Sequence, residues 1–230
     1  MYKKITHEIV EEHFAKPMQA PMIEITNNGP LPSYVMTEAT MLFRMDARSA
    51  WSKWVWSLLN YSISLNGNLP GTDQVKGRMH KNAVALGDFL IPYYGLTASR
   101  AITSALIAID DIGMHYVEVL KAKAPQSEID KVIASWTPYI SDLAELMNEL
   151  NPGQWPKSLI SDILTNLIQA WQDELTARAK GDLIADEIAI DYINKLVVTG
   201  VPDHTKAGFS SLADVFSRGI VAQFPSMFAE

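Results

Sequence analysis

The sequence of 230 residues contains no cysteine. Disulfides, zinc–thiolate sites, iron–sulfur clusters and cysteine nucleophiles are therefore excluded. Positive charge is scarce as well, because 19 basic residues stand against 26 acidic ones and the formal net charge is −7. The densest basic positions are Lys3 with Lys4 and Lys121 with Lys123. Since nucleic-acid binding requires a basic surface that neutralises phosphates, we expect no nucleic-acid partner.

Long apolar runs are also missing. The longest stretch without a charged side chain begins at Trp54 and is interrupted by Asn60, Gly67 and Pro70, so we expect no membrane span. The chain has no glycine-rich phosphate loop, no G-x-S-x-G elbow and no H-E-x-x-H zinc motif. None of the five histidines has a Glu three residues before it, the spacing that ferritin-type di-iron bundles use. These absences fit a cytoplasmic protein without a recognised cofactor.

Proline, glycine and asparagine divide the chain into segments whose apolar residues recur at helical spacing. A short helix is predicted at 5–15, and the four prolines between 17 and 32 then exclude a helix and predict an extended arm. The helices predicted beyond the arm are 36–65, 73–91, 97–123, 127–150, 157–180, 182–198 and 210–223. Short loops make consecutive helices antiparallel neighbours. We therefore expect an all-α, antiparallel helical bundle over 36–230, with the short helix and the extended proline-rich arm within 1–35.

Three metal-ligand side chains share one face of a predicted helix. Asp111, His115 and Glu118 follow each other at i, i+4 and i+7, with Asp110 beside them, so oxygen and nitrogen ligands could converge. The same spacing is typical of a solvated polar face on which Asp111 pairs with protonated His115. We favour the polar face, because a ligand set normally needs partners from a second helix.

The other histidines give weaker patterns. The segment His7–His13 is rich in possible ligands, but its alternating charge is typical of a surface helix. His80 and His204 are expected in or near loops, and Asp203 is the acidic neighbour of the second. No metal site is predicted from these residues.

Tryptophans are concentrated in the first bundle helix. Trp51 and Trp54 recur at helical spacing, and such residues lie in the core more often than in a ligand pocket. Trp56 lies off that stripe, and we consider it a residue that could face a partner.

Several short motifs then occur in order along the chain. They are Arg78–Asn82, Gly87, Pro92–Gly95, Asn151–Pro152, Trp155 and Gly219–Phe224. In this order and spacing, over about Met41 to Phe224, the chain resembles a family of uncharacterised small bacterial helical proteins. The resemblance implies an antiparallel bundle in which several helices carry a histidine next to acidic residues, a pattern that suggests a metal or polar core site.

This chain departs from that pattern at the histidine positions. Their counterparts here are Arg48, Ile109, Leu167 and Asn194, whereas acidic companions persist at Asp46, Glu174 and Asp191. A guanidinium, two hydrocarbons and an amide cannot replace imidazole as a good transition-metal ligand. The resemblance therefore implies that this member does not bind a metal there.

Arg48 takes one of these core-facing positions, on a helix whose other face carries Trp51 and Trp54. An unpaired guanidinium in a core is strongly disfavoured. Bidentate acceptors for it are available in Asp110, Glu174 and Asp191. The alternative is a surface arginine that pairs with Asp46 or with solvent, and both interpretations remain open at this point.

The sequence thus proposes a polar core or pocket and assigns no catalytic, cofactor or metal residue. The candidate residues are Arg48, Trp51, Asp110, Asp111, His115, Glu174 and Asp191. Our first interpretation is a non-enzymatic helical-bundle protein that acts by small-molecule or protein binding and forms a homo-oligomer. The alternative is a metal-dependent or small-molecule enzyme with an inter-helix site around Asp111, His115 and Glu174.

Overall fold

The computed structural model describes residues 37–200 and 211–229. Within these ranges every regular element is a helix, which confirms the all-α prediction. The helix predicted at 5–15, the predicted proline-rich arm and residues 201–210 lie outside the described residues. None of the described helices is both long and apolar enough to cross a membrane.

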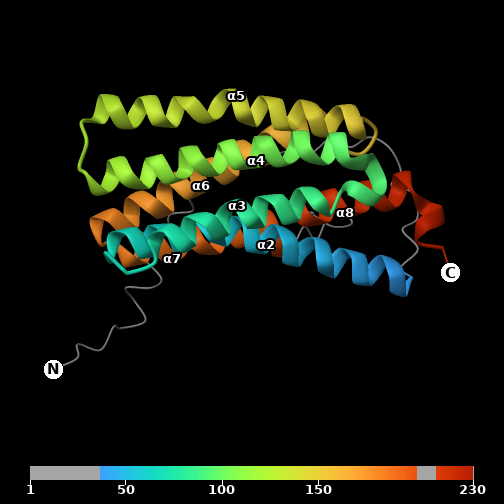
Figure 1. Ribbon diagram of the computed structural model, residues 1–230, viewed down its shortest axis with the longest axis horizontal. Helices are drawn as coiled ribbons and strands as arrows, with labels where there is room; N and C mark the ends of the chain where they lie inside the picture. Colours follow the sequence, from blue (N-terminus) through green and yellow to red (C-terminus); the bar gives the residue numbers. More distant parts are fainter. Residues whose placement is uncertain (1–36, 201–210, 230) are drawn as a thin grey trace, which may run out of the picture. The chain divides into compact units, whose positions relative to one another are not determined.

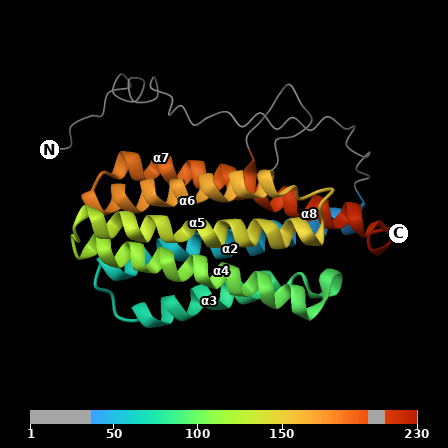
Figure 2. The ribbon, with the colours of Figure 1, turned by 90° about the horizontal axis from the view of Figure 1, so that it is seen from above.

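The helices follow each other in an antiparallel order (Figure 1). They are α2 (Glu38–Asn66), α3 (Thr72–Asp88), α4 (Ile91–Lys121), α5 (Gln126–Leu150), α6 (Lys157–Lys180), α7 (Leu183–Asn194) with the π-helical turn η1 (Lys195–Thr199), α8 (Leu212–Gln223) and the 3₁₀ turn η2 (Pro225–Met227). Consecutive helices pack side by side, and α8 returns to pack on α2. Helices α3 and α7 lie at opposite edges of this arrangement (Figure 2).

Local signals in the sequence fix where the helices begin and end. The side chains of Thr37, Asp182 and Ser211 each accept a backbone N–H from the first turn of the helix that follows, as N-cap residues do. The break between the helices predicted at 73–91 and 97–123 corresponds to a kink at Gly95, which has φ 77° and ψ 174° and interrupts α4. One turn of helix precedes it, so α4 begins at Ile91 rather than near residue 97.

A cluster of aromatic rings forms the centre of the core. The ring of Trp54 lies 5.6 Å from that of Trp51 and 5.3 Å from that of Trp171, and Trp51 lies 5.5 Å from Phe216. These edge-to-face contacts join α2 to α6 and α8, and each is worth about 0.5–1.5 kcal/mol beyond the burial of area. The predicted core positions of Trp51 and Trp54 are confirmed, while Trp56 is half-buried.

Helices α3 and α4 approach closely at Gly87, which is buried. The Ser99 hydroxyl donates to the Gly87 carbonyl at 2.8 Å. A Cβ atom at this position would collide with the Thr103 side chain and lie 3.0 Å from the Ser99 carbonyl oxygen. The absence of a side chain therefore sets the distance between the two helices.

Replacing Gly87 by alanine should lower the free energy of unfolding by about 1–3 kcal/mol, because the added methyl group overpacks the contact. The matched control is Gly77→Ala in the same helix, where an added Cβ has nothing within 4 Å. That change should raise the free energy of unfolding by about 0.5–1 kcal/mol, as alanine favours helix more than glycine does. Urea unfolding of both variants tests the pair, and equal effects would contradict the proposed close contact.

Candidate functional site

Asp110 is one of two fully buried acidic residues of the predicted site, with 1% of its surface exposed. Among the described residues, no hydrogen bond reaches its carboxyl oxygens or the indole N–H groups of Trp51 and Trp54. Burial raises the pKa of Asp110 well above its ordinary value and the charge of Asp111 raises it further, whereas the indole of Trp54 lowers it. The core therefore favours the neutral carboxyl, which is a poor partner for a guanidinium.

A second interior group lies between α6 and α7. Glu174 has 1% of its surface exposed, and its Oε1 accepts a hydrogen bond of 2.7 Å from Nε of Arg178. Nη2 of the same arginine lies 2.8 Å from Oδ2 of buried Asp186. Burial raises the pKa of Glu174 to about 7, Arg178 lowers it in part, and Asp186 raises it. Two carboxyl groups thus share one cation, and near neutral pH Glu174 is partly protonated.

Arg48 has a carboxylate partner on another helix, but not one of the three expected. Its Nε and Nη2 donate to the two oxygens of Asp214 in α8 at 3.1 and 3.0 Å. Arg44, one turn earlier in α2, donates to the same oxygens at 2.7 and 2.9 Å. Burial alone would raise the pKa of the Asp214 carboxyl, but these hydrogen bonds and charges lower it overall.

The packing of the helices explains why Arg48 pairs with Asp214 and not with the expected carboxylates. Helix α8 packs on α2 and brings Asp214 to it, whereas the Glu174 carboxylate is engaged by Arg178 and Asp191 is exposed on α7. The Arg48 side chain keeps 36% of its surface exposed, so the guanidinium lies at the edge of the core. It is neither enclosed nor a purely surface residue.

The polar stripe on α4 lies at the surface. Asp111 pairs across helices, since its Oδ1 lies 2.8 Å from Nε2 of His80 in α3. This contact replaces the expected pairing with His115, whose Nδ1 lies 3.6 Å from Oε2 of Glu118. Glu118 also accepts a 2.8 Å hydrogen bond from the Tyr61 hydroxyl. His80 lies within α3, not near a loop as expected. Both acidic residues of the stripe, Asp111 and Glu118, thus have a protein partner.

The predicted site residues do not form one cluster. Trp51, Asp110 and Glu174 lie in the interior, Arg48 lies at its edge, and Asp111, His115 and Asp191 lie at the surface. The alternative enzyme site would need Asp111 and His115 beside Glu174. However, Asp111 pairs with His80 of α3, His115 lies beside Glu118 at the surface, and Glu174 binds Arg178 in the interior. In the ranges 37–200 and 211–229, no three or more His, Asp or Glu side chains are placed to hold a metal ion.

The structure adds four residues that the sequence analysis did not single out: Arg44, Arg178, Asp186 and Asp214. The i, i+4 spacing of Arg44 with Arg48 and of Glu174 with Arg178 was visible in the sequence. No local signal connects Arg48 to Asp214, because 166 residues separate them.

A groove of about 250 Å³ lies between α2 and α3. Its lining residues are Asp46, Ser49, Ala50 and Lys53 from α2 and Asn82, Ala85 and Phe89 from α3. Neither the Asp46 carboxylate nor the Lys53 ammonium forms an ion pair with another described residue. The volume is below the roughly 300–1,000 Å³ that is typical of small-molecule sites.

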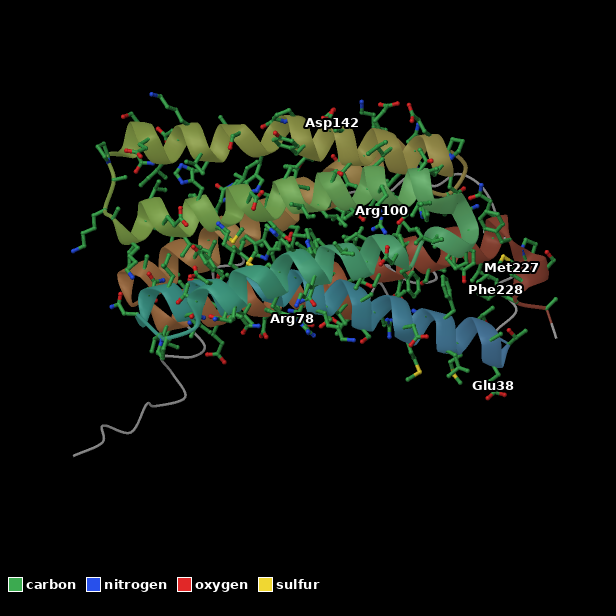
Figure 3. The ribbon with its side chains drawn as sticks, in the orientation of Figure 1. Glu38, Arg78, Arg100, Asp142, Met227 and Phe228 are labelled. Atoms are coloured by element: carbon green, nitrogen blue, oxygen red, sulfur yellow. The ribbon has the colours of Figure 1, made fainter. Side chains whose placement is uncertain are left out.

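The N-terminal half of α2 exposes large apolar side chains. The exposed fractions are 47% for Met41, 51% for Leu42 and 60% for Met45. This half of the helix runs along the lower edge of the bundle in Figure 1, with no described helix beneath it. Glu38, at its start, lies at the same end of the bundle as Met227 and Phe228 (Figure 3). We refer to the exposed side of α2 from Glu38 to Ile63 as the outer face.

No family model matches this sequence, and neither a curated protein nor a solved structure matches it. The likeness to uncharacterised bacterial helical proteins therefore stays an expectation from the motifs. The positions that correspond to two of that family's histidines, Ile109 and Leu167, lie in the apolar core with 1% and 0% of their surface exposed.

Removing both arginines from Asp214 should cost more than the sum of the single removals. Arg44→Ala and Arg48→Ala should each lower the free energy of unfolding by about 1 kcal/mol, because the remaining guanidinium still pairs with the carboxylate. The double variant should lose roughly 3–5 kcal/mol, since it leaves a buried charge unpaired. Denaturant unfolding in a double-mutant cycle measures the coupling. Adding Asp214→Asn to the double variant should recover part of the loss, and strictly additive effects would contradict the pairing.

Glu174 should make stability depend on pH near neutrality. Its pKa is raised in the folded protein from 4.5 to about 7, so its favourable contribution is fully present below about pH 4.5 and is lost as the pH rises through 7. The unfolding free energy of the wild type minus that of Glu174→Gln should therefore fall by about 3 kcal/mol across this window. Glu187→Gln, at an exposed position in α7, is the control and should give a curve parallel to the wild type. If the difference in unfolding free energy between the wild type and Glu174→Gln does not change with pH, the pKa of Glu174 is not raised in the folded protein.

Proposed function

We propose that this protein acts by binding another protein through the outer face of α2. The observation that carries the proposal is the exposure of Met41, Leu42 and Met45, each about half exposed within five residues of one helix. Single exposed apolar residues are ordinary on protein surfaces, but a contiguous group of them marks an interaction site. Met45 lies four residues after Met41 and three after Leu42, so both are its neighbours on the helix surface.

The composition of α2 supports this proposal. From Trp54 to Asn66 the helix carries no charged side chain. A long helical segment without charged side chains is more typical of a helix in contact with protein than of one facing water. The inner side of α2 is covered by the other helices, and a partner at the outer face would complete its burial.

Small-molecule binding has weaker support. The groove between α2 and α3 is small, and two opposite charges, Asp46 and Lys53, border it. A cytoplasmic setting and a function without a bound cofactor belong to the proposal, as the lack of cysteine and of cofactor motifs suggests.

An enzyme is the second candidate function, and one observation favours it. The pKa of Glu174 is raised to about 7 beside Asp186, and titratable groups with shifted pKa values are concentrated in active sites. However, both carboxyl groups are buried, so a substrate could reach them only after α6 and α7 separate. For this reason we give protein binding the preference.

Photo-crosslinking in cells tests the proposal. A photoreactive amino acid in place of Met45 should give one discrete adduct, because this side chain is 60% exposed at the centre of the apolar group. Introducing Leu42→Lys beside it should remove the adduct, since an ammonium group at the interface must be desolvated. The matched control places the same photoreactive residue at Glu187, which is exposed on α7. No adduct at position 45, or one that Leu42→Lys leaves unchanged, would exclude this surface.

A further inference from the structure

We propose that the partner of the outer face is a second copy of this chain, bound through antiparallel packing of α2 on α2. This inference rests on the proposed function and specifies its partner. The exposed residues along α2 form one stripe, and two charges beside it have no ion-pair partner among the described residues.

The outer face forms a continuous stripe. The residues exposed or half-exposed along it are Glu38, Leu42, Met45, Ser49, Ser52, Trp56, Asn60 and Ile63. Steps of three or four residues keep them on one side of the helix. At 1.5 Å per residue the stripe is about 38 Å long, and only its first residue is charged.

Two charged side chains flank the stripe on the side of α3. Asp46 and Lys53 both line the groove between α2 and α3 and are seven residues, or about 10 Å, apart. Neither forms an ion pair with another described residue. They have opposite signs and similar exposure, so the stripe has complementary charges on the two sides of its midpoint.

A two-fold axis at that midpoint brings the charges together. If two α2 helices pack antiparallel with the axis between Ser49 and Ala50, each Asp46 lies opposite Lys53 of the second copy, and the pair occurs twice. In a parallel arrangement the α3 sides of the two copies lie on opposite sides of the seam, so Asp46 and Lys53 of the two copies do not meet. Pairing of these two charges therefore requires the antiparallel arrangement.

The same register also matches the uncharged side chains. It places Met45 beside Trp56 of the second copy, and Glu38 close to the amide of Asn60 of the second copy. The residues at the axis are small, so the helices can approach closely there. On the α8 side of the stripe the register brings Arg48 of the two copies near each other, and each guanidinium remains paired with Asp214 of its own copy.

The size of the face indicates a dimer of moderate affinity. A strip about 38 Å long and 10 Å wide covers roughly 400 Å², and the α3 side of the groove adds to it. Stable interfaces bury about 800 Å² on each partner. We therefore infer a dimer that dissociates on dilution rather than an obligate one.

Sedimentation equilibrium of the full chain over a range of concentrations tests the inference. The wild type should reversibly form dimers, and Met45→Lys should be monomeric throughout the range. Asp46→Lys and Lys53→Asp should each weaken the dimer about tenfold, because each introduces two like-charge contacts. The double variant carrying both changes should return to within about threefold of the wild type. Glu187→Lys, on exposed α7, is the control and should leave the affinity unchanged.

Each other result overturns the inference in a distinguishable way. A wild type that stays monomeric excludes the second copy as partner, and a crosslinked adduct at Met45 whose mass differs from twice 25.6 kDa would then keep the proposed function with another protein. A dimer that does not respond to Met45→Lys uses a different face. A dimer that the double charge variant fails to restore does not have the antiparallel register.

Discussion

The ion pair between Asp214 and two arginines holds α8, the last α-helix of the bundle, against α2, the first one that the structure describes. Helix α8 has only 12 residues, a length at which an isolated helix is marginal in water. Its position depends on tertiary contacts, and these combine the stacking of Phe216 on Trp155 at 5.5 Å with the bidentate contacts from Arg44 and Arg48. About a third of each arginine side chain is exposed to solvent. The ion pair with Asp214 therefore avoids much of the desolvation cost of a fully buried ion pair.

The interior acidic groups are accommodated in three different ways. The Asp214 carboxylate is paired with two arginines, Glu174 shares Arg178 with Asp186, and burial raises the pKa of Asp110 and so favours its neutral form. The pKa shifts have opposite signs, so acid weakens the first arrangement while base weakens the other two. The folded state therefore has opposing pH limits that arise from the packing of three separate pairs of helices.

Much of the fold could be predicted from the sequence because its signals are local. Prolines, glycines and capping side chains such as Thr37 determine where helices begin and end, and the helical spacing of Trp51 and Trp54 places them in the core. The pairing of polar groups was not predictable in this way. The sequence offers several carboxylates as partners for Arg48, and the packing of α8 on α2 determines that Asp214 is the one it contacts.

The candidate site illustrates the same limit. The stripe of Asp111 and His115 on α4 is visible in the sequence, but its contact with His80 depends on how α3 lies beside α4. Asp110 is next to Asp111 of this stripe in the sequence. Successive side chains point about 100° apart around a helix, so Asp111 lies at the surface and Asp110 in the core. Neighbours in sequence were therefore separated in space, and the seven candidates divided between interior and surface.

The hydroxyl of Thr37 donates to the carbonyl oxygen of Phe228 at 3.1 Å, which joins the residue before α2 to the segment after α8. In topological terms, the described helices form a ring rather than a line. A ring can be opened at another loop without changing the contacts between its helices, as in circular permutation. The loop at Gly153 between α5 and α6 is such a place, because an added Cβ there meets no atom within 4 Å. The order of the helices along the chain is thus one of several that the same packing would accept.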